Sequence, residues 1–325
     1  MAVPGGTFQT HQAIGNREDL SDIINDISPM DTPFYTNIAK NDASNTTHEW
    51  QTDSLAAAAL NSQIEGDDAD ADTATPTARL SNICMISRKV PRVAGTQRAV
   101  DAAGRADELD YQVAKRGREL KRDIETALCG SQAATAGAAA SARVMAGLGA
   151  WIATNEVATA ASTAQTTPVT TSGYPTTAPT AGTAGTFVES DLKEAIKLCW
   201  DEGGDPTVVM TGSFNKQQAS AFSGIGTLYR DSQPNGALRP GSIVGAADVY
   251  VSDFGTHQIV ANRFQPAGTA YVLDLDYWAC SFLRPIQTED LAKTGDSDRK
   301  MLIAEYTLEA KNEKASGKVA TLTTG

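Results

Sequence analysis

Side chains able to carry out enzymatic chemistry are few and scattered in this sequence. Its three histidines are His11, His48 and His257. Its four cysteines fit no metal or redox spacing and are typical of small buried thiols: Cys84, Cys129, Cys199 and Cys280. A Cys–His nucleophile pair, for instance Cys280 with His257, lacks any supporting local motif. We predict that His48, in an extended segment, is a strand residue and not a general base.

Sequence signatures of nucleotide and hydrolase sites are also missing. The chain has no GxxxxGK[ST] phosphate loop, no GxGxxG, no GxSxG and no HExxH. One acidic run has the start of a calcium loop, because Asp68, Asp70 and Asp72 stand at positions one, three and five. Position six is Thr73 where glycine is required, and position twelve is Arg79 where glutamate is required. We therefore predict no enzyme, and no catalytic, cofactor-binding or metal-site residue.

The composition of the chain argues against two classes of binding partner, nucleic acids bound avidly and membranes. The 325-residue chain has a formal charge of −12 and a pI near 4.7, so it lacks the basic footprint of an avid nucleic-acid binder. No apolar run approaches the roughly 20 residues that span a bilayer, and the N-terminus lacks the pattern of a secretory signal. We expect two lobes, each with its own core, and no membrane partner.

One long amphipathic helix is predicted over residues 105–129 and would organise the first lobe. Its apolar residues recur at helical spacings on one face: Leu109, Val113, Leu120, Ile124 and Leu128. Six basic and six acidic residues share the rest of the helix, which predicts a nearly neutral structural spine. Four of its basic residues are candidates for a weak, salt-sensitive contact with DNA: Arg116, Arg118, Lys121 and Arg122.

Two segments before this helix predict an arm and a projecting hairpin. Residues 20–27 favour a short helix, and a second helical piece is expected to end near Lys40. Residues 48–55 and 79–90 are predicted to be paired strands that flank an acidic tip. Acids at the tip and bases at its foot favour head-to-tail contact between copies, with a solvated polar loop as the alternative. The candidate contact residues are Glu65, Asp67, Asp68, Asp70, Asp72, Arg88, Lys89 and Arg92.

The second half of the chain reads as an α/β lobe followed by strands. A low-complexity segment reaching residue 184 marks the expected lobe boundary. Thr186 and Glu189 have the spacing of a capping box, which predicts a helix with Val188 on its apolar face. Residues 305–312 alternate between polar and apolar, which predicts a half-buried strand that returns to the first lobe.

Several stretches, in order along the chain, resemble tailed-bacteriophage major capsid proteins of the podovirus-type family. They are GNREDLSDIINDISPMDTPF (15–34), HEWQTDSL (48–55), GRELKRDIETAL (117–128), AGLGAWIATN (146–155) and AEYTLEAKNEKASGKVATL (304–322). The resemblance implies an α+β chain of the Hong Kong 97 capsid fold. It implies an N-terminal arm at 1–45, an extended loop at 46–90, a peripheral domain at 91–185, an axial domain at 186–261, and a return to the peripheral domain at 262–325.

The function implied by the resemblance is self-assembly into hexamers and pentamers of an icosahedral virion shell around double-stranded DNA. Assembly would take place in the cytoplasm of the bacterial host, with portal, decoration and separate scaffolding proteins as further partners. No lysine lies between Lys40 and Lys89, so a covalent cross-link from the loop tip is not expected. An encapsulin-like cargo shell and a soluble hydrolase are the alternatives that the sequence leaves open.

Overall fold

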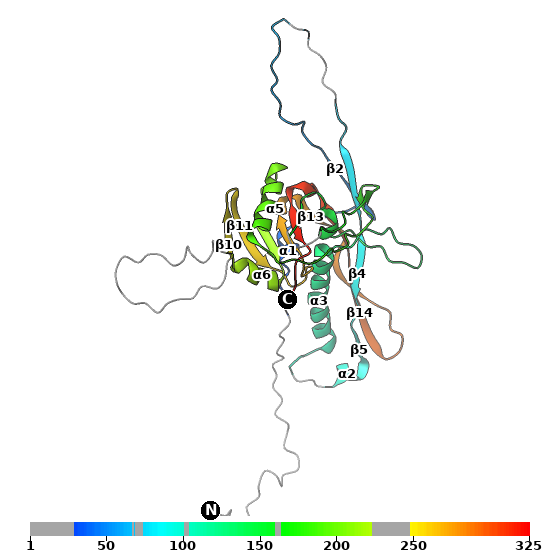
Figure 1. Ribbon diagram of the computed structural model, residues 1–325. Coiled ribbons are helices and arrows are strands. Elements are labelled where there is room, and N and C mark those ends of the chain that lie inside the picture. The colour runs from blue at the N-terminus through cyan, green and yellow to red at the C-terminus, as the bar shows by residue number, and fades with distance from the viewer. Residues whose placement is uncertain (1–28, 67, 69–73, 101–103, 160–163, 223–247) are drawn as a thin grey trace, which may run out of the picture.

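The computed structural model describes residues 29–66, 68, 74–100, 104–159, 164–222 and 248–325. The helix predicted over 20–27 lies outside these residues. Within them the chain mixes helices and strands in two main sheets, and a long hairpin projects away from the body (Figure 1).

A five-stranded sheet forms the first layer. Its strands run in the order β1 (Ala39–Asp42), β13 (Trp278–Asp290), β14 (Ser297–Ala310) and β4 (Met85–Lys89), and β5 (Arg92–Ala94) pairs with the other end of β14. β1 is parallel to β13, and the other pairs are antiparallel.

The prediction of a half-buried strand at 305–312 is wrong. Glu305, Thr307 and Glu309, on the expected solvent face of β14, are at most 8% exposed. β14 is a central strand between β13 and β4, and both of its faces are covered. Helix α3 (Glu108–Cys129) packs on the sheet, and β2 (Thr47–Thr52) and β3 (Ala78–Ile83) also contact β14. The alternation of polar and apolar residues in this strand therefore does not mark a solvent-exposed face, because its polar residues are buried.

A six-stranded sheet forms the second layer. Its order is β10 (Val249–Ser252), β11 (Gly255–Ala261), β9 (Val208–Thr211), β12 (Ala270–Leu273), β15 (Gly317–Ala320) and β6 (Glu156–Ala158). β12 pairs directly with β9, so residues 270–273 lie in the same sheet as residues 208–211. The reason is burial: all four residues of β12 are inaccessible and need sheet partners on both sides.

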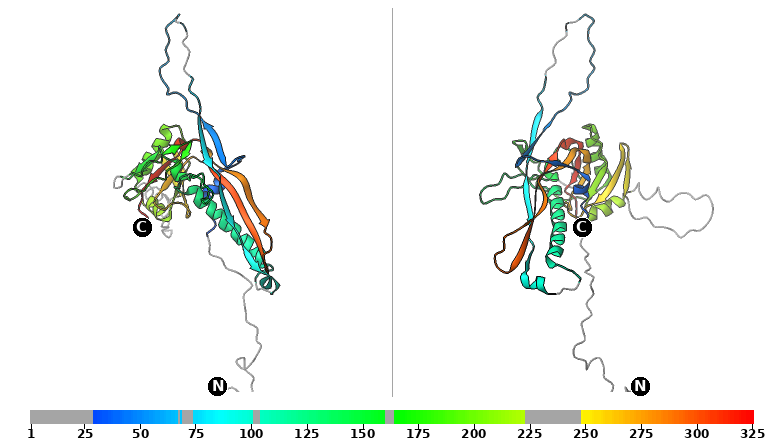
Figure 2. Two further views of the ribbon diagram at one scale, coloured as in Figure 1. Left: turned by 90° about the vertical axis from the view of Figure 1, so that its right-hand side faces the viewer. Right: turned by 180° about the vertical axis from the view of Figure 1, so that it is seen from behind.

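Helix α3 begins three residues later than predicted. The Asp107 side chain accepts a hydrogen bond from the Leu109 backbone N–H at 2.8 Å and fixes the start of the helix. Leu109, Leu120, Ile124 and Leu128 are buried as the spacing predicted. Figure 2 shows the helix running along one face of the β13–β14 sheet.

Other predicted boundaries change for local reasons. The helical piece expected to end near Lys40 is α1 (Pro33–Asn37), which ends earlier. Lys40 instead belongs to strand β1 and pairs with Cys280 of β13. The strand expected over 79–90 divides at Cys84, so that β3 pairs with β2 and β4 joins β14. The remaining elements are α2 (Gly95–Ala99), α4 (Leu148–Trp151), β7 (Thr170–Thr171), β8 (Tyr174–Pro175), α6 (Ser213–Ser220), and 3-10 turns at Leu275–Tyr277 and Glu313–Ala315.

The predicted capping box is also wrong. Helix α5 (Glu189–Asp201) has Val188 at its N-cap position and no side-chain cap. Thr186 lies outside the helix, and Val188 is 41% exposed, so it does not belong to the apolar face. Glu189 instead bonds to Lys193 at 2.9 Å and to the Tyr250 hydroxyl at 3.1 Å.

One core cluster joins the two sheets. Leu120 and Leu128 of α3 share it with Met210 of β9 and Tyr271 of β12. A second cluster lies between α5 and the six-stranded sheet, around Ile196 and Val272. The lobes are therefore fused through the first cluster, which fixes α3 relative to both.

Candidate interaction surfaces

The extended loop is the most exposed part of the chain that the structure describes. Its base is the antiparallel pair β2–β3, and the described residues that follow β2, up to residue 66, project well beyond the body (Figure 1). Three apolar side chains on this segment have almost no contact with their own chain: Leu55 is 99% exposed, Leu60 94% and Ile64 78%. Sequence reasoning missed them, since they show neither helical nor strand periodicity.

A polar cluster around the buried residues Ser281 and Glu309 holds the base of this loop. His48 Nε2 on β2 lies 3.3 Å from Glu309 Oε2 on β14 and 3.3 Å from Ser281 Oγ on β13. Ser281 Oγ and Asn41 Nδ2 donate to the same carboxylate oxygen at 3.0 and 2.9 Å. The bond with His48 and the two other donors outweigh burial and lower the pKa of Glu309 to about 2.

This cluster contains serine, histidine and glutamate but lacks the geometry of a catalytic triad. In a triad one ring nitrogen of histidine contacts the serine and the other contacts the carboxylate. Here the same nitrogen faces both Ser281 and Glu309, and Ser281 is fully buried. The cluster joins β2 to β13 and β14, as does the bond from Trp50 Nε1 to the Ala310 carbonyl at 2.8 Å. Its role in this arrangement is to orient the loop.

The predicted inter-subunit residues lie in different settings. Glu65 and Asp68 are exposed on the loop, and Asp67, Asp70 and Asp72 lie outside the described residues. At the foot of the loop Lys89 pairs with Asp123 of α3 at 2.7 Å, and Arg92 Nε donates to Ser297 Oγ at 2.9 Å. Arg88 is exposed and has no ion pair within the described part of the chain.

The four predicted DNA-facing residues are likewise divided. Arg116 pairs with Glu119 at 2.5 Å, and the Arg122 guanidinium lies 6.0 Å from the centre of the Phe264 ring. Arg118 and Lys121 are exposed and make no ion pair with any described residue. Of the four predicted residues, Arg118 and Lys121 are therefore the two that are exposed without an ion pair to a described residue.

Glu125 is a contact that sequence reasoning missed, because it was counted among the surface acids of the long helix. Its carboxylate is fully buried and accepts from the backbone N–H groups of Phe34 and Tyr35 in α1, at 2.9 and 2.7 Å. It also accepts from Asn262 Nδ2 at 2.7 Å. Burial raises the pKa of Glu125 despite these bonds. One side chain thus fastens the arm, the spine helix and the end of β11.

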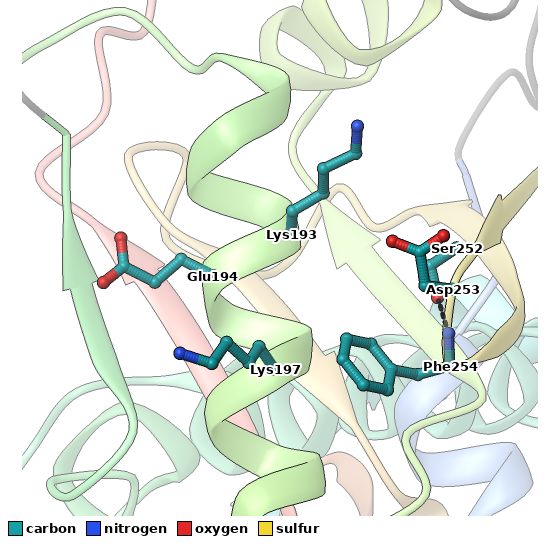
Figure 3. A pocket seen from close by; sticks show the side chains of 6 residues that line it. All are labelled: Lys193, Glu194, Lys197, Ser252, Asp253 and Phe254. Atoms are coloured by element: carbon teal, nitrogen blue, oxygen red, sulfur yellow. Dashed lines mark hydrogen bonds between the residues drawn. The ribbon is translucent and has the colours of Figure 1, made fainter.

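A hollow lies between α5 and the β10–β11 turn (Figure 3). It has a volume of about 430 Å³ and is lined by Lys193, Glu194, Lys197, Ser252, Asp253 and Phe254. Its charges are mixed. Ser252 Oγ lies 2.7 Å from His257 Nε2, whose Nδ1 faces the Pro206 carbonyl at 2.6 Å. His257 thus stabilises the hairpin, and the sequence-level pair with Cys280 is not formed.

The cysteines are buried free thiols, as predicted. Burial raises the pKa of Cys280 and of Cys199 to about 12, so neither supplies a thiolate near neutral pH. The described residues contain no group of three or more His, Cys, Asp or Glu side chains placed to hold a metal ion. None of their helices has the length and apolar character needed to cross a bilayer.

Comparison with known proteins shows the family of this chain. The family model described as "SU10 major capsid protein" matches residues 4–323. The chain belongs to the SU10 major capsid protein family. It is also 27% identical, over 95% of both chains, to the major capsid protein of Escherichia phage Phieco32.

Solved structures show the same fold. The capsid asymmetric unit of cyanophage A-1(L) aligns with a TM-score of 0.68 at 13% identity, covering 97% of this chain and 98% of that one. A structure from Mycobacterium phage Bobi aligns with a TM-score of 0.60 at 13% identity, covering 94% and 95%. The α+β architecture is the Hong Kong 97 capsid fold, with arm, extended loop, spine helix and α/β lobe. The chain is a capsid shell protein of the virion, and neither the cargo-shell nor the hydrolase alternative is favoured.

Proposed function

We propose that copies of this chain assemble into hexamers and pentamers that close an icosahedral shell around double-stranded DNA, and that the extended loop supplies one of the contacts between copies. The observation that carries this proposal is the exposure of Leu55, Leu60 and Ile64 on a segment that leaves its own fold. Burying an apolar side chain of this size contributes about 1.5–3 kcal/mol, which this chain does not gain by itself. A neighbouring copy that covers the loop supplies the missing burial.

Charge supports a head-to-tail arrangement of this contact. Glu65 and Asp68 are exposed on the loop, and Arg88 is exposed at its foot without an ion pair among described residues. Lys89 and Arg92 already have partners in their own chain, so Arg88 is the proposed basic partner at the foot. A contact between different surfaces of identical chains closes into a ring when its rotation is a simple fraction of a turn. Many weak copies of it hold a closed shell cooperatively.

The remaining partners and the place of assembly belong to the same proposal. The chain would work without catalysis, together with separate scaffolding, portal and decoration proteins, and would assemble in the host cytoplasm. The segments 1–45, 46–90, 91–185, 186–261 and 262–325 are proposed as arm, extended loop, peripheral domain, axial domain and peripheral return. The sheet pairing supports assigning β12 and β15 to the axial layer within the last segment.

The test is to replace loop side chains that no described residue covers. We expect L55S/L60S to leave the circular-dichroism spectrum unchanged and to abolish shells in negative-stain electron microscopy and sedimentation, with the scaffolding protein co-expressed. V169S/V188S is the matched control, since Val169 and Val188 are exposed apolar residues elsewhere (55% and 41%). Shells of normal yield from L55S/L60S would refute the loop contact, and a wild-type chain that stays monomeric would refute assembly itself.

A further inference from the structure

The base of the extended loop belongs to neither main sheet. Among the described strands, β2 and β3 form a two-stranded sheet of their own. β3 ends just before Cys84, and β4 continues from there in the five-stranded sheet. The angle at which the loop leaves the body is therefore set by contacts made by β2 and β3, since no continuous sheet carries them.

A tight turn from the threonine-rich segment holds the edge of β3. The two residues between β7 and β8, Ser172 and Gly173, both have positive φ (57° and 87°), as a type I′ hairpin turn requires. The Gly173 carbonyl accepts from the Ser81 N–H at 2.9 Å, and the Ser172 carbonyl accepts from Ser81 Oγ at 3.1 Å. A Cβ at position 173 would lie 3.0 Å from the Arg79 carbonyl oxygen. Glycine therefore lets the turn approach β3 this closely.

The segment that carries this turn, residues 164–185, is fastened at both ends to the six-stranded sheet. Near its start the Gln165 N–H donates to Glu156 Oε1 of β6 at 3.0 Å. At its end Gly185 forms a parallel bridge with Leu322, which follows β15. We call residues 164–185 the strap. The strap therefore joins the six-stranded sheet to the base of the extended loop.

Threonine side chains give the strap internal order. The Thr176 N–H and hydroxyl both donate to the Val169 carbonyl, at 2.8 and 3.0 Å, and the Val169 N–H donates to Thr177 Oγ1 at 2.8 Å. Thr166 and Thr180 are joined by two further bonds, of 3.1 and 2.8 Å. Hydroxyl groups that satisfy nearby backbone atoms fix a chain that its composition alone would leave as a linker.

We infer that the strap sets the angle between the extended loop and the six-stranded sheet, with Ser172 and Gly173 as positioning residues for the loop contact between copies. This inference rests on the proposed function, because the angle matters where the loop meets a neighbouring copy. The cluster around Glu309 holds β2 against the five-stranded sheet, and the strap ties β3 to the six-stranded sheet. Anchors on both strands fix a direction, whereas a single anchor lets the base swing. In a closed shell a change of that direction alters every repeated contact and hence the curvature.

Hydrogen exchange of unassembled subunits tests the strap before any shell forms. In G173A the added Cβ pushes the turn away from β3, so exchange of the Ser81 amide should quicken roughly tenfold. G203A is the matched control, because Gly203 has a φ of +92°, close to the +87° of Gly173, and no described atom beyond its own neighbours in the chain lies within 4 Å of its Cβ position. Both variants strain the backbone alike, but G173A alone should loosen residues 78–83. Equal exchange over residues 78–83 in the two variants overturns the inference.

A distance measured by electron spin resonance tests the angle itself. The four native thiols are buried, so spin labels attach to cysteines introduced at exposed positions of β3 and β11, in A78C/Q258C. In this background we expect G173A to broaden or shift the distribution of label distances and G203A to leave it unchanged. S81A removes the side-chain bond to Ser172, should act in the same direction to a smaller extent, and replaces G173A if that variant does not fold. An unchanged distribution in G173A, or in S81A as its replacement, overturns the inference.

Shell geometry connects the strap to the contact between copies. With the scaffolding protein co-expressed, G203A should give shells of wild-type diameter in negative-stain electron microscopy. G173A should give shells of altered diameter or open sheets. Normal shells from G173A, despite a loosened loop base, would overturn the role of the strap in setting the contact. Failure of the wild-type chain to form shells would instead count against the proposed function.

Discussion

Two buried carboxylates, Glu125 and Glu309, hold separate elements of this chain together. Their environments shift the pKa of the two groups in opposite directions. Burial dominates at Glu125 and raises its pKa, whereas the bonds from His48, Asn41 and Ser281 dominate at Glu309 and lower its pKa to about 2. Each joins elements that are more than a hundred residues apart for at least one of its bonds.

Removing Glu125 should release the arm from the spine helix. In E125A the Phe34 and Tyr35 N–H groups and the Asn262 amide lose their acceptor, at a cost of roughly 2–4 kcal/mol in the free energy of unfolding. Hydrogen exchange should quicken at residues 33–38, and urea denaturation of unassembled subunits gives the free energy. E119A is the control and should cost below about 1 kcal/mol, because the Arg116–Glu119 pair is partly exposed and joins two residues of the same helix. Equal effects of the two substitutions would contradict the assigned role.

Glu309 should make the chain acid-sensitive over a defined range. Its folded pKa of about 2 lies below its ordinary value of 4.5, so its contribution is complete above pH 4.5 and is lost as the pH falls towards 2. The full loss is on the order of 3 kcal/mol. The melting temperature of wild type should therefore drop more between pH 6 and pH 3 than that of E309Q. Parallel pH profiles for the two proteins would show that Glu309 is not a stabilising anion.

At the scale of elements, helix starts depend on which residue can reach the first free N–H groups. Asp107 caps α3 and also bonds to Arg98 at 2.6 Å, whereas α5 starts after Val188 without a side-chain cap. The sequence pattern favoured a side-chain cap only at the start of α5, at Thr186. The bridge of Gly185 to Leu322 holds the preceding chain, and Glu189 bonds to Lys193 and Tyr250 in the first turn of α5.

The two helix starts should respond differently to alanine. T186A should change the free energy of unfolding by less than about 0.5 kcal/mol, since Thr186 is exposed and caps nothing. D107A should lower the melting temperature clearly, because it removes the Leu109 bond and the Arg98 pair together. Thermal melting monitored by circular dichroism compares them. A fall in melting temperature in T186A as large as that in D107A would show that Thr186 does cap α5.

At the scale of the whole molecule, the two layers are not independent units. The chain passes from β12 in one sheet through β13 and β14 in the other and back to β15. A shared core around Leu120, Met210 and Tyr271 joins the layers, so α3 keeps a fixed orientation relative to both. The projecting loop and helix α3 therefore belong to one packed body. That arrangement suits a subunit whose function depends on repeated contacts at fixed angles.

The sequence by itself determined the long helix, its buried face, the buried cysteines and the hairpin with exposed acids, because these depend on local periodicity and composition. Its motifs also indicated the capsid family. Only the tertiary structure decided that Glu305, Thr307 and Glu309 are interior, that β12 and β15 join the second sheet, and that Asp123 and Glu125 of α3 bond to other elements. These facts depend on partners distant in the chain, such as Arg143 for Glu305 and Lys89 for Asp123. No local pattern encodes which distant side chain neutralises a given charge.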